Sequence, residues 1–348
     1  RRAIWALLIA GAIVGAVPLY QQMTGTFDNN YGGFGQITSD GFRTGEELLQ
    51  GSYRQPRLAG MLGEQNGFAQ VMLMLLPLGM FRFLGEKSKG LRILALVATT
   101  LIAFAIALTF SRGAALGFVM MLLIMTLMRI IKLYQLAIFT LVAFLLLAAL
   151  PQYWIRLATI PTISALFSED RASEVGEPDG SIKGRATEML AAALVFADYP
   201  MIGVGPGMYR YYSQEYGNKY IGIRMLEGNR QAHSLYLGLA ADNGALGLIL
   251  FLAILYVTLR NLARVRKRYI RSHPELANMA TGFMLTVIVY MTTGLFKHMA
   301  YVRFFWLMIA LAGAASYVAS ANVLTKMGVA EKNAAETTPA SVQPTVSD

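Results

Sequence analysis

Long apolar stretches constrain the fold of this chain more than any other feature of its sequence. Eight of them are close to the length that an α-helix needs to cross a lipid bilayer, about 20 residues. They lie near residues 3–19, 65–84, 92–110, 113–128, 133–150, 234–259, 277–296 and 302–320. Hydrophobic residues make up 55% of the 348 residues and charged residues only 14%. This pattern predicts an all-α polytopic membrane protein with about eight transmembrane helices.

Basic residues between these stretches predict the topology. Short connections rich in lysine and arginine lie at 86–92, 129–132 and 260–271. Because cytoplasmic connections of membrane proteins are enriched in these residues, we expect all three connections in the cytoplasm. Residues 20–64, the turn at Ser111 and the stretch 151–233 are then outside. The formal charge of +10 is explained by this topology, so we expect contacts with membrane lipids and no nucleic-acid partner.

The segments outside the spans suggest a single large domain. Residues 1–320 are predicted to form a membrane-embedded domain that includes the external loops 20–64 and 151–233, and residues 321–348 a disordered cytoplasmic tail. The chain does not begin with Met, which suggests that N-terminal sequence has been removed. Short helices are expected in the second loop. One of them, at 188–197, has a predicted buried face formed by Met189, Leu190, Ala193, Leu194 and Ala197.

Two arginines lie at predicted helix starts on the external side, Arg112 and Arg185. A helix N-terminus carries partial positive charge, so an arginine there is unfavourable unless an anion binds. The guanidinium group binds phosphate oxygens with two parallel hydrogen bonds. These features predict an anion site. The alternatives are that Arg112 extends to lipid headgroups and that Arg185 pairs with Glu188.

His233 directly precedes the sixth apolar stretch, and Ser234 is the predicted helix cap. A histidine at a helix N-terminus among arginines should be neutral, and a neutral imidazole can accept a proton from a sugar hydroxyl. The alternative is a histidine at the membrane interface. His273 and His298 are interpreted as loop or headgroup residues. With no cysteine and three histidines in the chain, we expect neither a metal site nor another cofactor.

The segment 203–209 combines glycines with the first of several tyrosines. GVGPG at 203–207 follows no predicted strand and precedes no Lys-Ser/Thr pair, so it is interpreted as a turn rather than a nucleotide site. The tyrosines at 209, 211, 212, 216 and 220 are typical of an interfacial aromatic belt, and stacking on sugar rings is the second interpretation. Tyr209 and Tyr212 are the candidate substrate contacts.

Several segments together resemble the O-antigen ligase and Wzy-type polymerase superfamily, bacterial membrane glycosyltransferases with a GT-C-like fold. They are FSRGAALG at 110–117, GRATEMLAAALVFADYPMIGVGPGMY at 184–209 and AHSLYLGLAADNGALGLILF at 232–251, with RLAGMLGEQNGFAQVMLMLLP at 57–77 as a looser match. The resemblance implies metal-independent, inverting transfer of a glycan from undecaprenyl diphosphate to an acceptor hydroxyl. It also implies an inner-membrane location with the site facing the periplasm.

The resemblance also assigns roles to residues. Arg112 and Arg185 would neutralise the diphosphate leaving group, and His233 would deprotonate or orient the acceptor hydroxyl. Arg57 would be a further phosphate ligand.

Several activities remain open on the sequence alone. The acceptor would be lipid A-core for a ligase, which we slightly favour, another glycan chain for a polymerase, or a protein serine or threonine for an oligosaccharyltransferase. An anionic-solute transporter and an envelope scaffold are alternatives from other classes. The spans carry almost no charge near their centres and show no repeat, which argues against a transporter.

Overall fold

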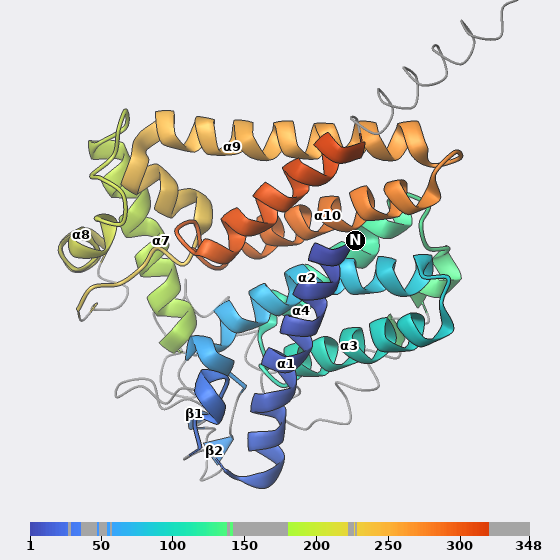
Figure 1. Ribbon diagram of the computed structural model, residues 1–348. Coiled ribbons are helices and arrows are strands. Elements are labelled where there is room, and N and C mark those ends of the chain that lie inside the picture. The colour runs from blue at the N-terminus through green and yellow to red at the C-terminus, as the bar shows by residue number, and fades with distance from the viewer. Residues whose placement is uncertain are drawn as a thin grey trace, which may run out of the picture.

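A computed structural model describes residues 1–26, 29–35, 47–48, 54–55, 58–137, 140–141, 180–221, 226 and 228–319. Within these ranges the protein is a bundle of helices (Figure 1). Five of the described helices are long and apolar enough to cross a membrane: α1 (Arg2–Thr24), α2 (Gln65–Gly85), α3 (Lys89–Ala107), α9 (Leu235–Tyr269) and α10 (Pro274–Thr293). Two shorter apolar helices are α4 (Arg112–Leu127) and the helix Arg303–Ala319.

These helices confirm the all-α membrane fold. Each of them overlaps one of the predicted spans, and most ends agree within a few residues. The largest difference is at α9, which continues to Tyr269 rather than ending near residue 259, because its last turns are strong helix-forming arginines and lysine. The predicted span at 133–150 lies mostly outside the described residues, as does the predicted tail 321–348, so the count of eight stays a prediction.

The remaining described elements are one helix of 19 residues and several short elements. Helices α7 (Gly180–Asp198) and α8 (Tyr209–Tyr216) lie together at one end of the bundle, and the π-helical turn η4 (Gly217–Ile221) follows α8. Before α2 the chain has two 3-10 turns, η1 (Tyr31–Gly33) and η2 (Gly60–Leu62). Two-residue strands β1 (Glu47–Leu48) and β2 (Arg54–Gln55) pair antiparallel between these turns.

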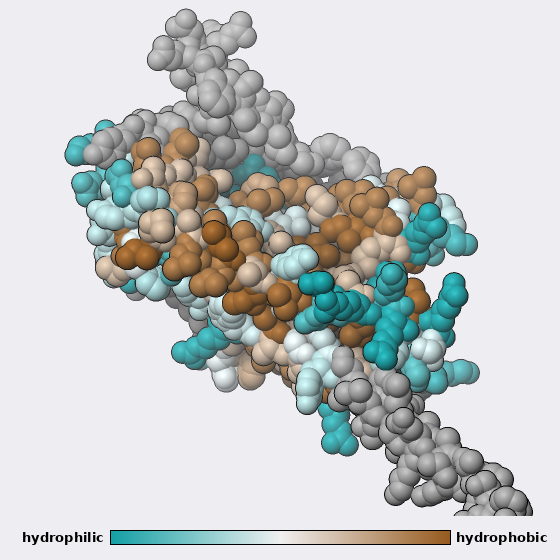
Figure 2. Space-filling view, turned by 90° about the horizontal axis from the view of Figure 1, so that it is seen from above, coloured by the Kyte–Doolittle hydropathy of each residue, from teal (hydrophilic) through white to brown (hydrophobic). Residues whose placement is uncertain are grey.

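Helices α2 and α10 form the interior of the bundle. In their most apolar windows 78% and 67% of the residues are buried, compared with 22% in α3 and α9. Polar side chains join the two inner helices, because Gln70 Nε2 donates to Thr293 Oγ1 at 2.7 Å and Thr286 Oγ1 donates to the Met74 carbonyl at 2.8 Å. The outer helices expose leucine, isoleucine and valine instead. Figure 2 shows these exposed residues as an apolar band with hydrophilic side chains at both ends, as expected for a bundle that spans a bilayer.

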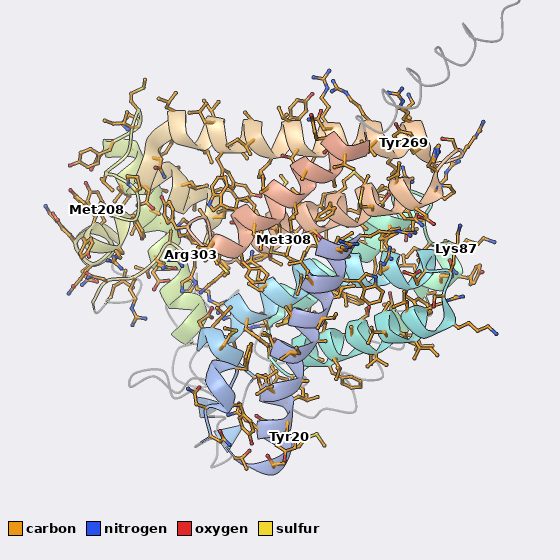
Figure 3. All side chains as sticks on the ribbon, in the orientation of Figure 1. Tyr20, Lys87, Met208, Tyr269, Arg303 and Met308 are labelled. Carbon is orange, nitrogen blue, oxygen red and sulfur yellow. The ribbon has the colours of Figure 1, made fainter. Side chains whose placement is uncertain are left out.

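The basic connections gather at one end of the bundle. Lys87 Nζ lies 3.6 Å from Glu275 Oε1, and Arg266 Nη2 donates to the Met128 carbonyl at 3.1 Å. These contacts join the connections near residues 86–92, 129–132 and 260–271. In Figure 3, Lys87 and Met208 lie toward opposite ends of the molecule. The loop that contains Met208 therefore belongs to the other end, which we call the site end.

A kink divides α9 near the site end. Gly244 has φ 65° and ψ −170°, outside the helical region. The turn after α7 packs into this kink, where Val204 N donates to the Ala241 carbonyl at 2.9 Å and Ala245 N donates to the Pro200 carbonyl at 2.8 Å. An added Cβ at Gly244 would lie 2.3 Å from backbone atoms of Met201, so only glycine fits there.

Helix α7 corrects two sequence predictions. It begins at Gly180, so Arg185 lies in its second turn rather than at its start, and the helix-dipole argument does not apply to Arg185. The glycines at 180 and 184 suggested a later start, but packing overrides propensity. The predicted buried face was also wrong. Ala191, Ala192 and Val195 are fully buried whereas Leu190 and Leu194 are exposed, because small side chains let α7 approach its neighbours α8 and α9 closely.

Candidate functional site

The site begins where α2 and α4 start side by side. Glu64 caps α2, and its carboxylate accepts from Asn66 N at 3.1 Å and Gly67 N at 2.7 Å. Ser111 caps α4, and its Oγ donates to Asn66 Oδ1 at 2.8 Å. Two helix N-termini with their exposed N–H groups are thereby held together. Arg112 is the first residue of α4, as predicted, and lies next to this junction.

Lys297 joins this junction from the turn after α10. Its Nζ lies 2.8 Å from Glu64 Oε2, with side-chain exposures of 16% and 27%. Burial alone would raise the pKa of the Glu64 carboxyl, but Lys297 and the N–H groups of Gly67 and Asn66 outweigh burial, and the pKa is lowered. Glu64 is therefore ionised at neutral pH. This contact places Lys297 in the site.

His233 lies on the segment that enters α9. Ser234 is the N-cap of α9, as predicted, and its Oγ accepts from Leu237 N at 3.4 Å. His233 itself has φ 46°, in the left-handed region that non-glycine residues rarely adopt. Strain of this kind costs about 1–3 kcal/mol and concentrates at functional sites. Its Nε2 lies 3.3 Å from Oε2 of Glu188 on α7, a buried carboxylate.

The charged groups that act on His233 include Arg185, another predicted site residue. The pKa of His233 is lowered to about 3, first by burial and then by the positive charges of Lys297 and Arg185, while Glu64 opposes the change. The imidazole is therefore neutral at pH 7. This agrees with the neutral ring expected from the sequence, but burial is the largest cause rather than the helix dipole. His233, Arg185, Lys297 and Glu64 thus form one cluster, which we call the cationic cluster.

The other predicted site residues that the structure describes do not belong to the cationic cluster itself. Arg112 is connected to it through Ser111 and Asn66. Arg57 lies outside the described residues. Tyr209 is 3% exposed and donates from its hydroxyl to the Glu188 carbonyl at 2.6 Å, so it holds α8 against α7. Tyr212 packs edge-on against Tyr199, with ring centroids 6.2 Å apart.

A pocket of about 400 Å³ opens beside the cationic cluster. Ala232, next to His233 in the chain, lines it together with Tyr209 and, from the turn after α10, His298 and Tyr301. Its other lining residues are Pro206, Gly207, Met208, Arg210, Tyr211, Gln231, Gly238 and Asp242. The pocket therefore combines tyrosine rings with polar side chains, a composition suited to a polar ligand with an apolar face.

Asp242 organises the floor of this pocket. Its Oδ1 accepts from Tyr209 N at 2.8 Å and its Oδ2 accepts from Tyr301 Oη at 3.0 Å. His298 Nε2 lies 4.0 Å from the same Oδ2. Asp242 thereby joins α9 to the start of α8 and to the turn after α10.

His298 lies in the connection after α10, as the loop interpretation expected, but it is buried rather than placed at the lipid headgroups. Only 8% of it is exposed, and its ring lies over the helix at Gly238, where an added Cβ would approach Nδ1 to 2.5 Å. Burial lowers the pKa of His298, and the Asp242 carboxylate opposes this only in part. The absence of a side chain at Gly238 makes this position possible. His273, by contrast, is exposed and precedes α10, as a loop residue should.

Sequence reasoning missed Glu64, Glu188 as the neighbour of His233, and the burial of His298. Their partners are far away in the sequence, and the one local signal was an acidic residue directly before the apolar stretch at 65. Among the described residues, no group of three or more His, Cys, Asp or Glu residues is placed to hold a metal ion. Positive charge at the site comes from Arg185 and Lys297, with Arg112 at its edge.

The fold and the site together define a multi-pass membrane protein with a histidine and several cations at one end of its helices. Residues 94–252 match the family model described as O-antigen ligase. This match spans less than half of the 348 residues, and it supports the resemblance to the O-antigen ligase and Wzy-type superfamily that the motifs indicated. The match includes Arg112, Arg185, Glu188 and His233, whereas Glu64, Lys297 and His298 lie outside it. A comparison with curated proteins gave no match. The family supports a membrane glycosyltransferase of ligase or polymerase type, with a lipid-linked glycan donor and a glycan acceptor.

Proposed function

We propose that this protein transfers a glycan from undecaprenyl diphosphate to a hydroxyl of lipid A-core, with inversion at the anomeric carbon. The observation that carries the proposal is the cationic cluster, in which a partly buried, neutral histidine lies beside a carboxylate and within the electrostatic influence of Arg185 and Lys297. Such a cluster offers a proton acceptor and an anion-binding group in the same place.

The cations bind the diphosphate in this proposal. Arg185 and Lys297 contact its oxygens, and Arg112 adds a third positive charge beside the N–H groups of α4. Negative charge grows on the leaving diphosphate as the glycosidic bond to phosphate breaks, and fixed cations stabilise that charge. No metal ion is invoked. Arg57 remains a proposed further ligand.

His233 accepts the proton. The acceptor oxygen attacks the anomeric carbon, the carbon–oxygen bond to phosphate breaks with its electron pair leaving on undecaprenyl diphosphate, and the hydroxyl proton passes to the imidazole. Because Nε2 faces Glu188, Nδ1 is the nitrogen that takes the proton. Glu188 then stabilises the imidazolium ion and holds the ring in position, as a carboxylate does for a histidine base in other enzymes.

The acceptor saccharide occupies the pocket next to His233. The pocket is bordered by Ala232 and by Tyr209, whose hydroxyl binds the Glu188 backbone. Tyr211 and Tyr301 are each about half exposed at its rim, so their rings are available to stack on a sugar face. Of these two residues, Tyr211 is one of the tyrosines for which the sequence suggested stacking on sugar rings as the second interpretation.

The location follows from the charges at the two ends. We propose the bacterial inner membrane, with the basic connections in the cytoplasm and the cationic cluster facing the periplasm. The domain from 1 to 320, the periplasmic loops 20–64 and 151–233, and a cytoplasmic tail from 321 remain part of this proposal.

Reconstituted protein tests the function directly. Proteoliposomes would receive undecaprenyl diphosphate-linked glycan, lipid A-core and EDTA, and product would be followed on a gel. We expect transfer by the wild type and loss of transfer in His233→Gln and Arg185→Gln. His273→Gln is the matched control, because His273 is exposed at the opposite end of the bundle.

Other products would identify the alternatives. Lengthening of the lipid-linked glycan that depends on His233 would indicate a polymerase, and transfer to serine or threonine of an added protein would indicate an oligosaccharyltransferase. Wild-type activity that EDTA abolishes would contradict metal independence. If His233→Gln retained full activity, the mechanism would be wrong, and a transporter or scaffold would become the better interpretation.

A further inference from the structure

A second pocket lies near the other end of α9, far along the helix from His233. It has a volume of about 380 Å³ and lies between α9 and the helix Arg303–Ala319. From α9 it is lined by Asn261, Arg264, Val265, Arg268 and Tyr269, and from the other helix by Gly313, Ser316 and Tyr317. Tyr269 Oη donates to the Ala319 carbonyl at 2.9 Å, which fixes the two helices together at this point. The pocket does not share a residue with the cationic cluster.

The length of α9 places this pocket at the edge of the bilayer. After the kink at Gly244, residues 245–269 extend roughly 37 Å at 1.5 Å per residue, more than the roughly 30 Å of the hydrocarbon core. Exposed apolar residues on this segment end at Val257. Arg264 follows about 10 Å further along the axis, and Arg268 one turn beyond it. Both arginines therefore lie at the depth of lipid headgroups.

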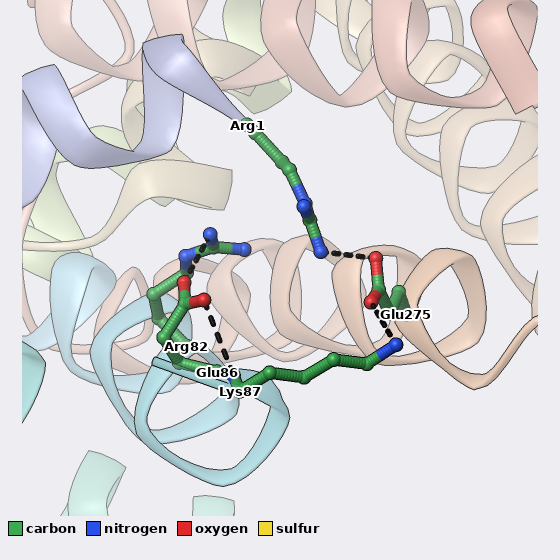
Figure 4. A network of polar contacts seen from close by, with 5 residues as sticks. All are labelled: Arg1, Arg82, Glu86, Lys87 and Glu275. Carbon is green, nitrogen blue, oxygen red and sulfur yellow. Dashed lines mark hydrogen bonds and ion pairs between the residues drawn. The ribbon is translucent and has the colours of Figure 1, made fainter. Parts of the chain in front are cut away.

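Three other cations at this end of the bundle are paired with carboxylates. Arg82 pairs with Glu86, and both Arg1 and Lys87 pair with Glu275 (Figure 4). Neither Arg264 nor Arg268 forms an ion pair within the part of the chain that the structure describes.

The contacts of these arginines leave their charges uncompensated. Arg264 Nη1 donates to Asn261 Oδ1 at 3.0 Å, and Arg268 lies over the Tyr269 ring at 5.8 Å from its centroid. Neither contact neutralises the guanidinium groups. Two such charges at positions i and i+4 share one face of a helix.

The opposite wall of the pocket is open and is formed by Gly313, Tyr317 and the largely buried Ser316. Tyr317 is 75% exposed, and an added Cβ at Gly313 would meet nothing within 4 Å. Val265 is buried at the base. A ligand here would meet two guanidinium groups on one side and Gly313 with the Tyr317 side chain on the other, which matches a phosphate group joined to acyl chains.

We infer that this pocket binds the headgroup of an anionic phospholipid. Arg264 and Arg268 bind its phosphate oxygens, since the guanidinium fork suits phosphate geometry. An acyl chain lies along Gly313 and Tyr317. Basic pockets between transmembrane helices at the cytoplasmic side are suited to anionic headgroups. The inference is independent of glycan transfer, because its evidence comes from different residues at the opposite end of α9.

Native mass spectrometry of the full chain in detergent tests this site. The protein would be titrated with dioleoylphosphatidylglycerol, and the lipid-bound fraction would be measured for the wild type and two double variants. Arg264→Gln with Arg268→Gln should weaken binding of the first lipid at least about 10-fold. Lys267→Gln with Arg271→Gln removes the same charge from exposed residues outside the pocket and should keep wild-type binding.

Two further titrations separate the possible ligands. Dioleoylphosphatidylcholine, which is zwitterionic, should bind at least several-fold more weakly than dioleoylphosphatidylglycerol, and millimolar inorganic phosphate should not displace the bound lipid. Equal loss in both double variants would show unspecific attraction by charge and overturn the inference. Equal binding of the two lipids, or displacement by inorganic phosphate, would overturn it as well. The elution volume in size-exclusion chromatography verifies that both double variants remain folded.

Discussion

His233 Nε2 lies 3.3 Å from Glu188 Oε2, and the two residues come from different elements, the entry to α9 and helix α7. The histidine is held in the left-handed region with φ 46°, and the carboxylate is buried. A carboxylate in this position fixes the ring and favours the protonated form once a proton arrives. The contact therefore makes Glu188 a positioning residue for the proposed base.

Glu188→Gln should lower kcat for glycan transfer by about 10- to 100-fold and leave KM for the lipid-linked donor nearly unchanged, because a residue that supports a functional side chain typically has effects of this size. Steady-state kinetics in proteoliposomes would measure both. Glu215→Gln, on the exposed side of α8, should have wild-type kinetics. Equal kcat for Glu188→Gln and wild type would remove Glu188 from the mechanism.

The Glu64–Lys297 ion pair should be needed for stability as well as for the site. Removing one partner leaves the other charge partly buried, so Glu64→Gln should cost about 1–3 kcal/mol of unfolding free energy. The double variant Glu64→Gln with Lys297→Gln should recover part of that loss. Thermal unfolding in detergent would measure all three proteins. A double variant less stable than the sum of the single changes would contradict a direct pair.

Stability should fall as pH decreases below about 6.5, the ordinary pKa of histidine. The folded state lowers the pKa of His233 to about 3, so the unfolded chain takes up the proton first, and acid favours unfolding. The pKa of His298 is lowered as well. Melting temperatures between pH 5 and 6.5 should therefore decline less steeply in His233→Gln and in His298→Gln than in wild type.

This pH window avoids Glu64, whose carboxyl has an ordinary pKa of 4.5 and a lower one in the fold, so that its contribution is lost only at more acidic pH. His273→Gln is again the control, since His273 is exposed. Identical slopes for all four proteins would mean that neither His233 nor His298 resists protonation.

Two glycines should respond differently to the same substitution. In Gly244→Ala, the alanine would have to adopt φ 65°, and its Cβ would lie 2.3 Å from the backbone of Met201. This substitution should therefore lower the free energy of unfolding by more than about 2 kcal/mol. Gly313→Ala adds a Cβ that meets nothing within 4 Å in a helix, and should change stability by at most about 1 kcal/mol. Thermal unfolding would measure both, and similar losses would contradict a specific requirement at the kink.

The bundle was predictable because each span is set by its own composition. Continuous apolar residues identified α2 and α10 nearly to their ends, and Ser234 identified the start of α9. The buried face of α7 was not predictable in the same way. In a membrane, leucines such as Leu190 can face lipid while alanines face the protein, so hydrophobicity alone points to the wrong side.

Site residues were predictable from the sequence where a reactive or charged side chain lies directly beside a predicted helix start. Arg112 follows a capping serine, and His233 precedes one, so both were found from nearby residues. The pairing of Glu64 with Lys297 was not predictable, because this contact joins segments more than 200 residues apart. The burial of His298 was missed because it depends on Gly238, which lies in α9. Long-range pairs of this kind require the fold.

Binding of the donor should raise the pKa of His233. In the free protein, positive charges of Lys297 and Arg185 act with burial to hold that pKa at about 3, too low for an efficient base at neutral pH. A diphosphate between these cations would cancel their effect and favour the protonated ring. The proposed mechanism therefore predicts that His233 becomes an effective base only when the donor is bound. Without the donor, His233 would stay unprotonated at neutral pH.

Nitrogen-15 NMR of histidine-labelled protein would measure this change with undecaprenyl diphosphate as the probe. The pKa of His233 should move upward from about 3 toward the ordinary value when the probe is saturating. In Lys297→Gln the free protein should already have a higher pKa, and the probe should raise it less, because one of the two cations is absent. An unchanged pKa at saturating probe would place the diphosphate away from His233 and contradict the proposed roles of Arg185 and Lys297.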